Sequence, residues 1–196
     1  MQEQEILKEF EDAHAILKGH FILSSGLHSD TYLQCARVMM DPKRGERLCK
    51  ALADKVKAGL GDTKIDMVIA PAMGGVVVGY EMGRQLNVET IFCERVDGEF
   101  ILRRGFDIED GVNVLLVEDV VTTGKSSMET VKCIEGYGGK VVAEASLVDR
   151  SNGETNFPFP LFSLLEVEVA TFEANKVPDN LAEIPAIKPG SRWLKP

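Results

Sequence analysis

The sequence predicts an α/β fold in which a mostly parallel central sheet is flanked by helices on both faces. Four apolar segments have the length and composition of buried strands: 65–70, 90–94, 112–117 and 141–148. Helical patterns at 76–86 and 126–137 follow the first and third of these segments, and Gly138–Gly139 closes the second helix. Strands that alternate with helices at this spacing pair in parallel, because each helix returns the chain to the same end of the sheet.

Helices are also expected before the first of these strands. Residues 3–17 place apolar side chains at helical spacing, which predicts a first helix that Gly19 ends. Asp41–Pro42 is typical of a helix N-terminus, where a capping carboxylate precedes a proline in the first turn. We expect this second helix to end at Gly59, and we expect short strands and turns in the Ser-, Gly- and aromatic-rich segment 21–34.

The chain length fits one domain, 1–196, with enough apolar residues for a core that needs no disulfide or metal. We expect the core at about 40–150, with residues 1–35 and the tail beyond Asp149 packed around it. Ligands of parallel sheets bind beyond the carboxyl ends of the strands. The following loops are therefore expected to lie together: those after Ala70, Glu94, Val117 and Val148.

Charge and cysteine content argue against several classes of protein. The net charge of −9, without a basic stripe, is untypical of nucleic-acid binding, which depends on Lys and Arg at phosphates. No apolar run approaches the length of a membrane span, and residues 1–5 lack the pattern of a signal peptide. The four cysteines are widely spaced, which is typical of reduced thiols in a cytoplasmic protein.

The segment 114–127 carries the most chemical information, with the sequence Val-Leu-Leu-Val-Glu-Asp-Val-Val-Thr-Thr-Gly-Lys-Ser-Ser. An apolar strand delivers two adjacent carboxylates, Glu118 and Asp119, and a hydroxyl- and glycine-rich turn then opens a helix. Free amides and the dipole at a helix N-terminus favour an anion. Gly124 lets the backbone close around a phosphate, and the Thr and Ser side chains as far as Ser127 add hydroxyl donors.

This turn differs from a nucleotide-binding P-loop, although it contains Gly124–Ser126. The P-loop requires a glycine five positions before its second glycine, where this chain has Asp119. A carboxylate beside a phosphate turn suits a phosphorylated sugar, whose hydroxyls donate to it, and a reaction in which positive charge develops at the anomeric carbon. The alternative, a helix cap that binds no ligand, is common for an isolated Asp-Thr pair but accounts poorly for the whole succession of residues.

The segment 114–127 resembles the phosphoribosyl-pyrophosphate (PRPP) signature of type I phosphoribosyltransferases. The resemblance implies the fold of that family, in which a small hood, formed mainly by residues 1–35 and part of the tail, covers the core. It also implies that Glu118 and Asp119 hold the ribose hydroxyls and act in catalysis, and that Mg²⁺ is carried by the donor without direct protein ligands. The PRPP-binding residues that it implies are Glu118, Asp119, Val120, Val121, Thr122, Thr123, Gly124, Lys125 and Ser126.

Three further segments resemble the orotate phosphoribosyltransferases, which make orotidine 5′-monophosphate in de novo pyrimidine (UMP) biosynthesis: the hood motif 19–32, the pyrophosphate loop 70–75 and the strand end 147–150. In that family an arginine at the strand end reaches orotate, and Arg150 suits the role because a guanidinium grips a carboxylate with two charged hydrogen bonds. By resemblance, Thr122 also contacts orotate. The alternative for Arg150 is a surface ion pair with Asp149 or Glu154.

The chain departs from this family in its cations. Many orotate enzymes carry lysines in the hood and in the pyrophosphate loop, where this chain has Ser24 and Gly74. The loop that supplies further cations is shorter here, as in a subgroup of the family, and matches only at Arg95. Because a pyrophosphate leaving group needs positive charge, we expect Arg95 to act in catalysis, and Arg103, Arg104 and Gly74 are further candidates for pyrophosphate contacts. The alternative for Arg103 and Arg104 is a solvated hairpin edge.

The resemblance further implies a homodimer, because in this family a loop of one subunit serves the site of the other. Two other functions stay open. One is a phosphoribosyltransferase for a purine or another pyrimidine, and the other is a non-enzymatic regulator on the same fold.

For two histidines and two aromatic residues of the hood motif we expect no catalytic role. His20 and His28 lack an orienting carboxylate, so solvent-exposed or capping positions are expected. Phe21 and Tyr32 are expected to pack within the hood, with Tyr32 along the base.

Overall fold

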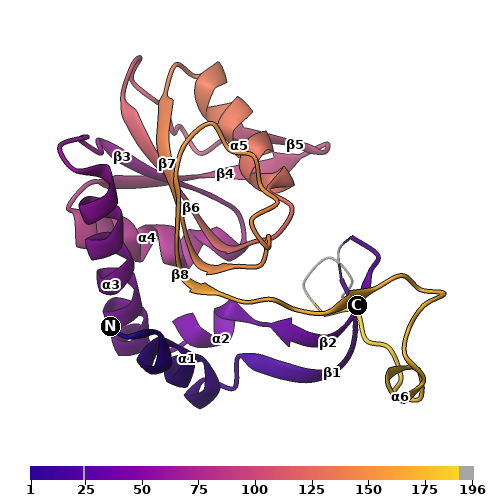
Figure 1. The fold of residues 1–196 in the computed structure, drawn as a ribbon. Helices are drawn as coiled ribbons and strands as arrows, with labels where there is room; N and C mark the ends of the chain where they lie inside the picture. Colours follow the sequence, from indigo (N-terminus) through magenta and orange to yellow (C-terminus); the bar gives the residue numbers. More distant parts are fainter. Residues whose placement is uncertain (24, 190–196) are drawn as a thin grey trace.

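The computed structural model describes residues 1–23 and 25–189 and confirms the α/β fold (Figure 1). Its large sheet has the strand order β5-β4-β3-β6-β7-β8. The strands are β3 (Met67–Pro71), β4 (Glu89–Val96), β5 (Glu99–Leu102), β6 (Asn113–Val121), β7 (Lys140–Asp149) and β8 (Leu161–Glu166). Neighbouring strands pair in parallel, apart from β4 and β5. The four predicted strands are confirmed, with slightly different ends.

Two strands of the large sheet differ from the prediction. β5 is joined to β4 by a tight turn at Asp97 and Gly98, which both have positive φ angles, 49° and 92°. An Asp-Gly pair between apolar segments is a strong hairpin signal, because it accommodates this backbone. β8 comes from the tail that was expected outside the core, and it pairs in parallel with β7.

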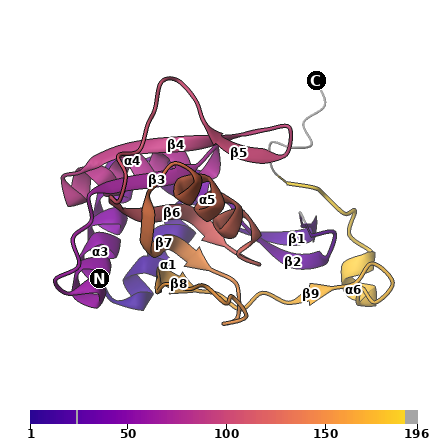
Figure 2. The same cartoon turned by 90° about the horizontal axis from the view of Figure 1, so that it is seen from above.

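Helices cover both faces of the large sheet (Figures 1 and 2). They are α3 (Pro42–Leu60), α4 (Gly74–Leu86) and α5 (Lys125–Gly136). Leu115 packs with apolar side chains of α3 and α4, whereas its neighbour Leu116 packs with those of α5, since successive residues of a strand face opposite sides. Among the helices described here, none combines the length and the apolar character that crossing a membrane would require.

The first helix ends earlier than predicted. α1 spans Glu3–Asp12, and the chain then turns at His14, whose φ of 50° lies in the left-handed region. The prediction that Gly19 ends this helix is wrong, because Gly19 lies within strand β1 (Ile16–Ile22). The apolar spacing continued into β1 because that strand also buries side chains against its neighbours.

The second predicted helix, α3, begins where expected. Asp41 caps it, because its side chain accepts hydrogen bonds from the backbone amides of Lys43 and Arg44 at 2.9 and 3.4 Å. The helix ends at Leu60 rather than at Gly59, and Gly61 follows with a φ of 56°. A short helix that was not predicted, α2 (Cys35–Met39), precedes α3.

A small sheet lies to one side of the large sheet in both ribbon views (Figures 1 and 2). It consists of β1, β2 (His28–Leu33) and β9 (Thr171–Phe172), and the short helix α6 (Asp179–Ala182) follows it in the chain. Backbone hydrogen bonds of 2.8 Å join Ile187 to both His20 and Ile22. The small sheet thus combines N-terminal and tail residues, as expected for the hood, and Ser24 lies outside the described residues.

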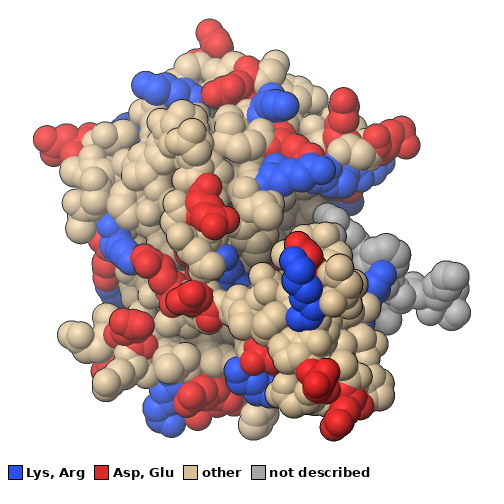
Figure 3. Space-filling model, turned by 45° about the vertical axis from the view of Figure 1, so that its right-hand side comes forward, with Lys and Arg blue, Asp and Glu red and all other residues tan. Residues whose placement is uncertain are grey.

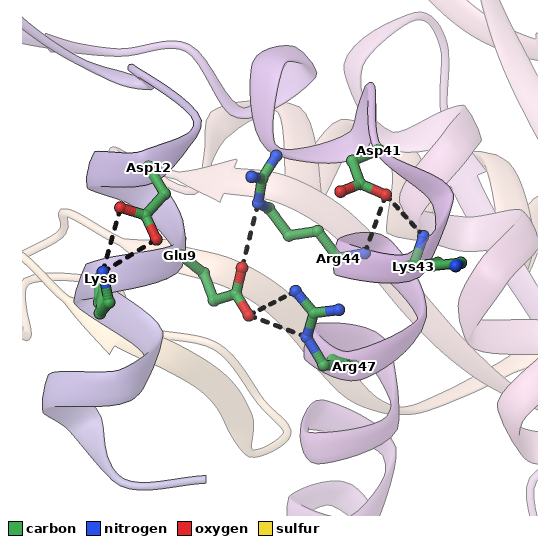
Figure 4. Close-up of polar contacts among 7 residues, drawn as sticks. All are labelled: Lys8, Glu9, Asp12, Asp41, Lys43, Arg44 and Arg47. Carbon is green, nitrogen blue, oxygen red and sulfur yellow. Dashed lines mark hydrogen bonds and ion pairs between the residues drawn. The ribbon is translucent and has the colours of Figure 1, made fainter.

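α1 was expected with the hood, but it contacts β8 and α2 and is bonded to the core helix α3. Two arginines of α3 hold Glu9 of α1 (Figure 4). The Glu9 carboxylate accepts from Arg44 Nε at 3.1 Å and from Arg47 Nε and Nη2 at 2.8 and 2.6 Å. Only 17% of the Glu9 side chain is exposed, so water competes weakly for these contacts.

We expect Glu9→Gln to lower the free energy of unfolding by about 1–3 kcal/mol, because it weakens charged hydrogen bonds to two arginines at once. Urea denaturation would measure this loss. The matched control is Asp12→Asn on the same helix, which removes an exposed ion pair with Lys8 and should change stability by less than about 0.5 kcal/mol. Equal losses in both variants would contradict this account of α1.

Charged side chains of both signs are interspersed on the face shown in Figure 3. Several arginines of the described surface are paired with carboxylates. Arg84, for example, contacts Glu46 at 2.7 Å and Glu81 at 2.8 Å. The electrostatic field over the face shown is therefore of mixed sign.

Candidate active site

The candidate active site lies at the carboxyl ends of β3, β6 and β7. β6 pairs with both of the other strands, so the loops that follow Pro71, Val121 and Asp149 run along one edge of the sheet. The backbone amide of Arg150 donates to the carbonyl of Val121 at 2.9 Å and joins two of these loops. The expectation is confirmed for these three strand ends, whereas Glu94, after which a fourth loop was expected, lies inside β4, which continues to Val96.

The turn between β6 and α5 has the geometry expected of an anion site. Gly124 is the N-cap of α5 with a φ of 71°, a conformation that other L-residues rarely adopt. A Cβ at this glycine would lie 2.7 Å from the ring of Phe157, so the chain after Arg150 also requires glycine here. Thr122 and Thr123 are exposed, and the first amides of α5 point out of the helix end where its dipole favours an anion.

Lys125 and Ser127 both lie in the first turn of α5, but their side chains have different surroundings. The Lys125 side chain is exposed and lies 3.9 Å from Glu129. Ser127 is buried, and its hydroxyl donates to Glu144 Oε1 of β7 at 2.7 Å. The expectation that the Ser127 hydroxyl adds a donor for phosphate is therefore wrong, because the side chain points toward the sheet.

Asp119 faces the side of the sheet that α4 covers. Its Oδ1 accepts from the amide of Val120 at 3.0 Å, and burial raises the pKa of its carboxyl above the usual range. A Cβ at Gly74, the first residue of α4, would lie 2.7 Å from the same oxygen. Gly74 therefore allows the loop 70–75 to approach Asp119 closely.

Glu118 faces the opposite side of the sheet, because adjacent residues of a strand alternate. Only 6% of the residue is exposed. Burial raises the pKa of Glu118 well above its usual range, the negative charges of Asp119 and Glu144 raise it further, and Ser126 and Arg95 partly offset these effects. The two adjacent carboxylates thus have different surroundings, which their order in the sequence did not reveal.

Arg150 and Asp119 both act electrostatically on Tyr32 of the small sheet. Burial raises the pKa of Tyr32, the charge of Asp119 raises it further, and the charge of Arg150 lowers it. Cys35, at the start of α2, is acted on by the same two charges. These electrostatic effects place the side chains of Tyr32, Cys35, Asp119 and Arg150 in one region of the protein. Of the four, only Cys35 was not expected there.

The Arg150 guanidinium is held in place without a counter-ion among the described residues. Burial lowers its pKa, and its Nε is buried with no hydrogen-bond partner in that part of the chain. It forms no ion pair with Asp149 or Glu154, the alternative partners. The Asp149 carboxylate instead accepts from the amide of Ser151 at 2.7 Å.

The three candidate cations of the β4–β5 hairpin are paired with glutamates. Arg95 bonds to Glu129 and lies over the ring of Phe100, 4.1 Å from its centroid. Arg104 contacts Glu94 at 2.7 Å, and Arg103 lies 3.6 Å from the same residue. Arg95 acts electrostatically on Glu118, whereas the exposed Arg103 and Arg104 match the solvated hairpin edge that was the alternative for them.

The two histidines of the small sheet bond to each other. His20 Nε2 lies 2.6 Å from His28 Nδ1, and His20 Nδ1 lies 2.9 Å from the carbonyl of Ile184. His20 is buried, so the expectation of a solvent-exposed position is wrong for it: the tail segment covers it. Phe21 and Tyr32 pack as expected, with ring centroids 5.7 Å apart.

Comparison with known proteins agrees with this geometry. Residues 40–179 match the family model described as phosphoribosyl transferase domain. The chain belongs to this phosphoribosyltransferase family. A protein of Erythrobacter litoralis (strain HTCC2594) named orotate phosphoribosyltransferase is 55% identical over 192 residues, covering 98% of this chain and 99% of that protein.

Solved structures of phosphoribosyltransferases share the fold. Orotate phosphoribosyltransferase from Aeropyrum pernix has a TM-score of 0.68 at 25% identity, covering 82% of this chain and 93% of that chain. Adenine phosphoribosyltransferase from Thermoanaerobacter pseudethanolicus has a TM-score of 0.57 at 20% identity, covering 70% and 88% respectively. Enzymes named for different bases thus have this fold, so the side chains of the site must decide the base.

Glu144 is a buried acid of this phosphoribosyltransferase that the sequence did not single out. It is fully buried, and burial raises its pKa from the ordinary value of 4.5 to about 7, with Ser127 partly opposing the shift. The folded protein therefore holds this proton more tightly than the unfolded chain does. The resulting contribution to stability is complete below pH 4.5 and is lost as the pH rises through about 7.

We expect Glu144→Gln to remove the loss of stability that Glu144 causes as the pH rises. Between pH 5 and 8 its free energy of unfolding should fall by about 2–3 kcal/mol less than that of the wild type. Chemical denaturation across this pH range measures the difference. Glu135→Gln, on the exposed side of α5, is the control and should keep the wild-type slope. Parallel curves for Glu144→Gln and wild type would refute the proposed burial of a protonated Glu144.

Proposed function

We propose that this chain is an orotate phosphoribosyltransferase, a pentosyltransferase that acts in de novo pyrimidine (UMP) biosynthesis. It transfers the phosphoribosyl group of PRPP to orotate and releases orotidine 5′-monophosphate and pyrophosphate. The observation that carries the choice of base is the half-buried Arg150 guanidinium, whose buried Nε has no hydrogen-bond partner among the described residues and whose backbone bonds to Val121, just before the turn 122–126. Orotate carries a carboxylate that purines and uracil lack, and this carboxylate would supply the missing counter-ion.

In this proposal the turn 122–126 binds the 5′-phosphate of the donor through the amides at the start of α5. Asp119 and Glu118 accept hydrogen bonds from the ribose hydroxyls. The bond from the orotate nitrogen to C1′ forms as the bond from C1′ to pyrophosphate breaks; the electron pair leaves with the pyrophosphate, and the proton of the orotate nitrogen passes to solvent. Positive charge develops on the ribose, and the buried carboxylate of Asp119 stabilises it in a low-dielectric site.

Positive charge for the leaving pyrophosphate would come from the β4–β5 hairpin. Arg95 is the first candidate because it lies close enough to lower the pKa of Glu118. Its bond to Glu129 would have to be exchanged for a bond to pyrophosphate. Arg103 and Arg104 are weaker candidates, since both contact Glu94, and Gly74 would offer its backbone where the pyrophosphate loop meets Asp119.

We propose that Mg²⁺ enters bound to the donor. It would neutralise charge on the pyrophosphate, and Asp119 and Glu118 fit its remaining water ligands because both are buried carboxyls whose ionised form gains from a nearby cation. The described residues contain no group of three or more His, Cys, Asp or Glu side chains arranged to hold a metal.

Orotate consumption followed by absorbance, with PRPP and Mg²⁺ present, tests the activity directly. We expect turnover of orotate and no turnover of hypoxanthine, adenine or uracil. Conversion of one of these bases without conversion of orotate would identify a different phosphoribosyltransferase. Binding of PRPP without turnover of any base would favour a non-enzymatic regulator.

Arg150→Ala should weaken the use of orotate and leave the donor nearly unaffected. A charged hydrogen bond of this kind contributes about 1.5–3 kcal/mol, so kcat/KM for orotate should fall roughly 10- to 100-fold. Steady-state kinetics with each substrate varied in turn measures both values. Lys50→Ala, which removes an exposed cation of α3, should behave as wild type. An unchanged response to orotate would mean that Arg150 does not bind it.

We also propose that the enzyme is a homodimer that associates through α4. Met73, Val77 and Tyr80 are 78, 54 and 69% exposed, and their spacing places them along one side of the helix. A row of large apolar side chains at the solvent is typical of a protein interface. The row begins next to Gly74, so a partner bound there would lie beside the pyrophosphate loop.

The double variant Val77→Asp, Tyr80→Asp should therefore be monomeric in sedimentation velocity at concentrations where the wild type is dimeric. Two buried charges would oppose association, and turnover should fall with it if the partner completes the site. Tyr137→Asp changes another exposed tyrosine, 43% exposed at the end of α5; it is the control and should stay dimeric. A dimeric double variant would exclude this face as the interface.

The same proposal places the enzyme in the cytoplasm. The four cysteines are all buried and free, which suits a reducing compartment.

A further inference from the structure

A buried polar layer lies between α5 and the sheet, directly beneath the phosphate turn. Its central contact joins Glu144 of β7 to Ser127 in the first turn of α5, with 2.7 Å between the two oxygens. Glu144 is 0% exposed and Ser127 1% exposed. On the same face Ser146 bonds to Ser163 of β8 at 2.6 Å, so the layer continues toward the end of the sheet.

Glu144 has an unusual environment for an acid. Its second oxygen, Oε2, is buried and has no hydrogen-bond partner in the part of the chain that the structure describes. No lysine or arginine of that part forms an ion pair with it. Burying a carboxyl with an unpaired oxygen costs folding free energy, and an apolar residue of similar size would cost less. The presence of Glu144 opposite Ser127 therefore needs an explanation.

The register of the sheet puts Glu144 next to the donor site. Glu144 lies opposite Leu116 on β6, and Glu118 lies two residues further along β6 on the same face. Ser127 is three residues after Gly124, so its hydroxyl ties the first turn of α5 to β7 at the point where the turn 122–126 enters the helix. The donor phosphate would bind to the amides of this same turn.

We infer that Glu144 is a positioning residue for the phosphoribosyl donor: through Ser127 it holds the start of α5, and with it the amides of the turn 122–126, in the geometry that binds the 5′-phosphate. This inference rests on the proposed phosphoribosyl transfer. The precision needed is high, because anion binding by amides depends on several hydrogen bonds being aligned together. Glu144 itself does not touch the substrate.

The ionisable neighbours of Glu144 are acidic. The charge of Asp149 raises the pKa of Glu144, and Glu144 in turn raises that of Glu118, whereas α5 and β8 present the hydroxyls of Ser127 and Ser163 on this face. A neutral carboxyl is therefore the form that suits the layer. An amide at position 144 keeps an oxygen that accepts from Ser127, so glutamine should replace glutamate in this role.

Three variants test the inference: Glu144→Leu removes the acceptor, Ser127→Ala removes the donor, and Glu144→Gln keeps the contact. We expect the KM for PRPP to rise about tenfold in the first two and to stay within about twofold of wild type in the third. The KM for orotate should stay within about twofold in all three. Inhibition by ribose 5-phosphate, which carries the phosphate but no base, should weaken in step with the KM for PRPP.

Thermal unfolding shows whether each variant is folded. If Glu144→Leu does not fold, Ser127→Ala decides the question, because it removes one hydroxyl from the same contact. A folded Ser127→Ala or Glu144→Leu variant with unchanged KM for PRPP would overturn the inference, as would equal increases in the KM values for PRPP and orotate. If the wild type uses PRPP with a base other than orotate, the proposed acceptor is wrong, and the same comparison of KM values for PRPP still tests Glu144.

Discussion

The parallel pairing of β6 with β3 and β7 is the constraint on which the rest of the site depends. It brings three strand ends to one edge, so that the loop 70–75, the turn 122–126 and Arg150 emerge side by side. The backbone bond from Arg150 to Val121 then sets the position of the arginine relative to the turn. A shift of register between β6 and β7 would separate the two, because each residue advances the strand by about 3.3 Å.

Burial of acidic groups is the second theme of the site. Glu118, Asp119 and Glu144 all have raised pKa values, and burial is the largest cause in each case. Such carboxyls are poorly stabilised by the protein alone, and they become favourable when a partner supplies positive charge or hydrogen-bond donors. Asp119 and Glu118 directly precede the turn 122–126, where the donor is proposed to bind, whereas Glu144 accepts a hydrogen bond from Ser127.

The small sheet completes the site from the other side. It places Tyr32 where the charges of Asp119 and Arg150 both shift its pKa. The tail segment is joined to this sheet by backbone hydrogen bonds at Ile187 and by a contact between His20 Nδ1 and the carbonyl of Ile184. Two parts of the chain separated by about 150 residues therefore build one structure. Because few local signals mark such a contact, the sequence indicated a hood but not the way in which its strands are held.

The sequence by itself determined four of the six strands of the large sheet, the N-terminus of α3 at Asp41 and the glycine turn that follows Glu118 and Asp119, because each depends on local periodicity or on residues a few positions apart. The resemblance of residues 147–150 to the orotate enzymes singled out Arg150, and its charge suits a carboxylate. Only the tertiary structure decided that β6 continues through Glu118 and Asp119 to Val121, that Ser127 turns inward to Glu144, and that Arg95 bonds to Glu129. These outcomes depend on which side chains from distant elements meet at each face of the sheet, and that is a property of packing that no short segment contains.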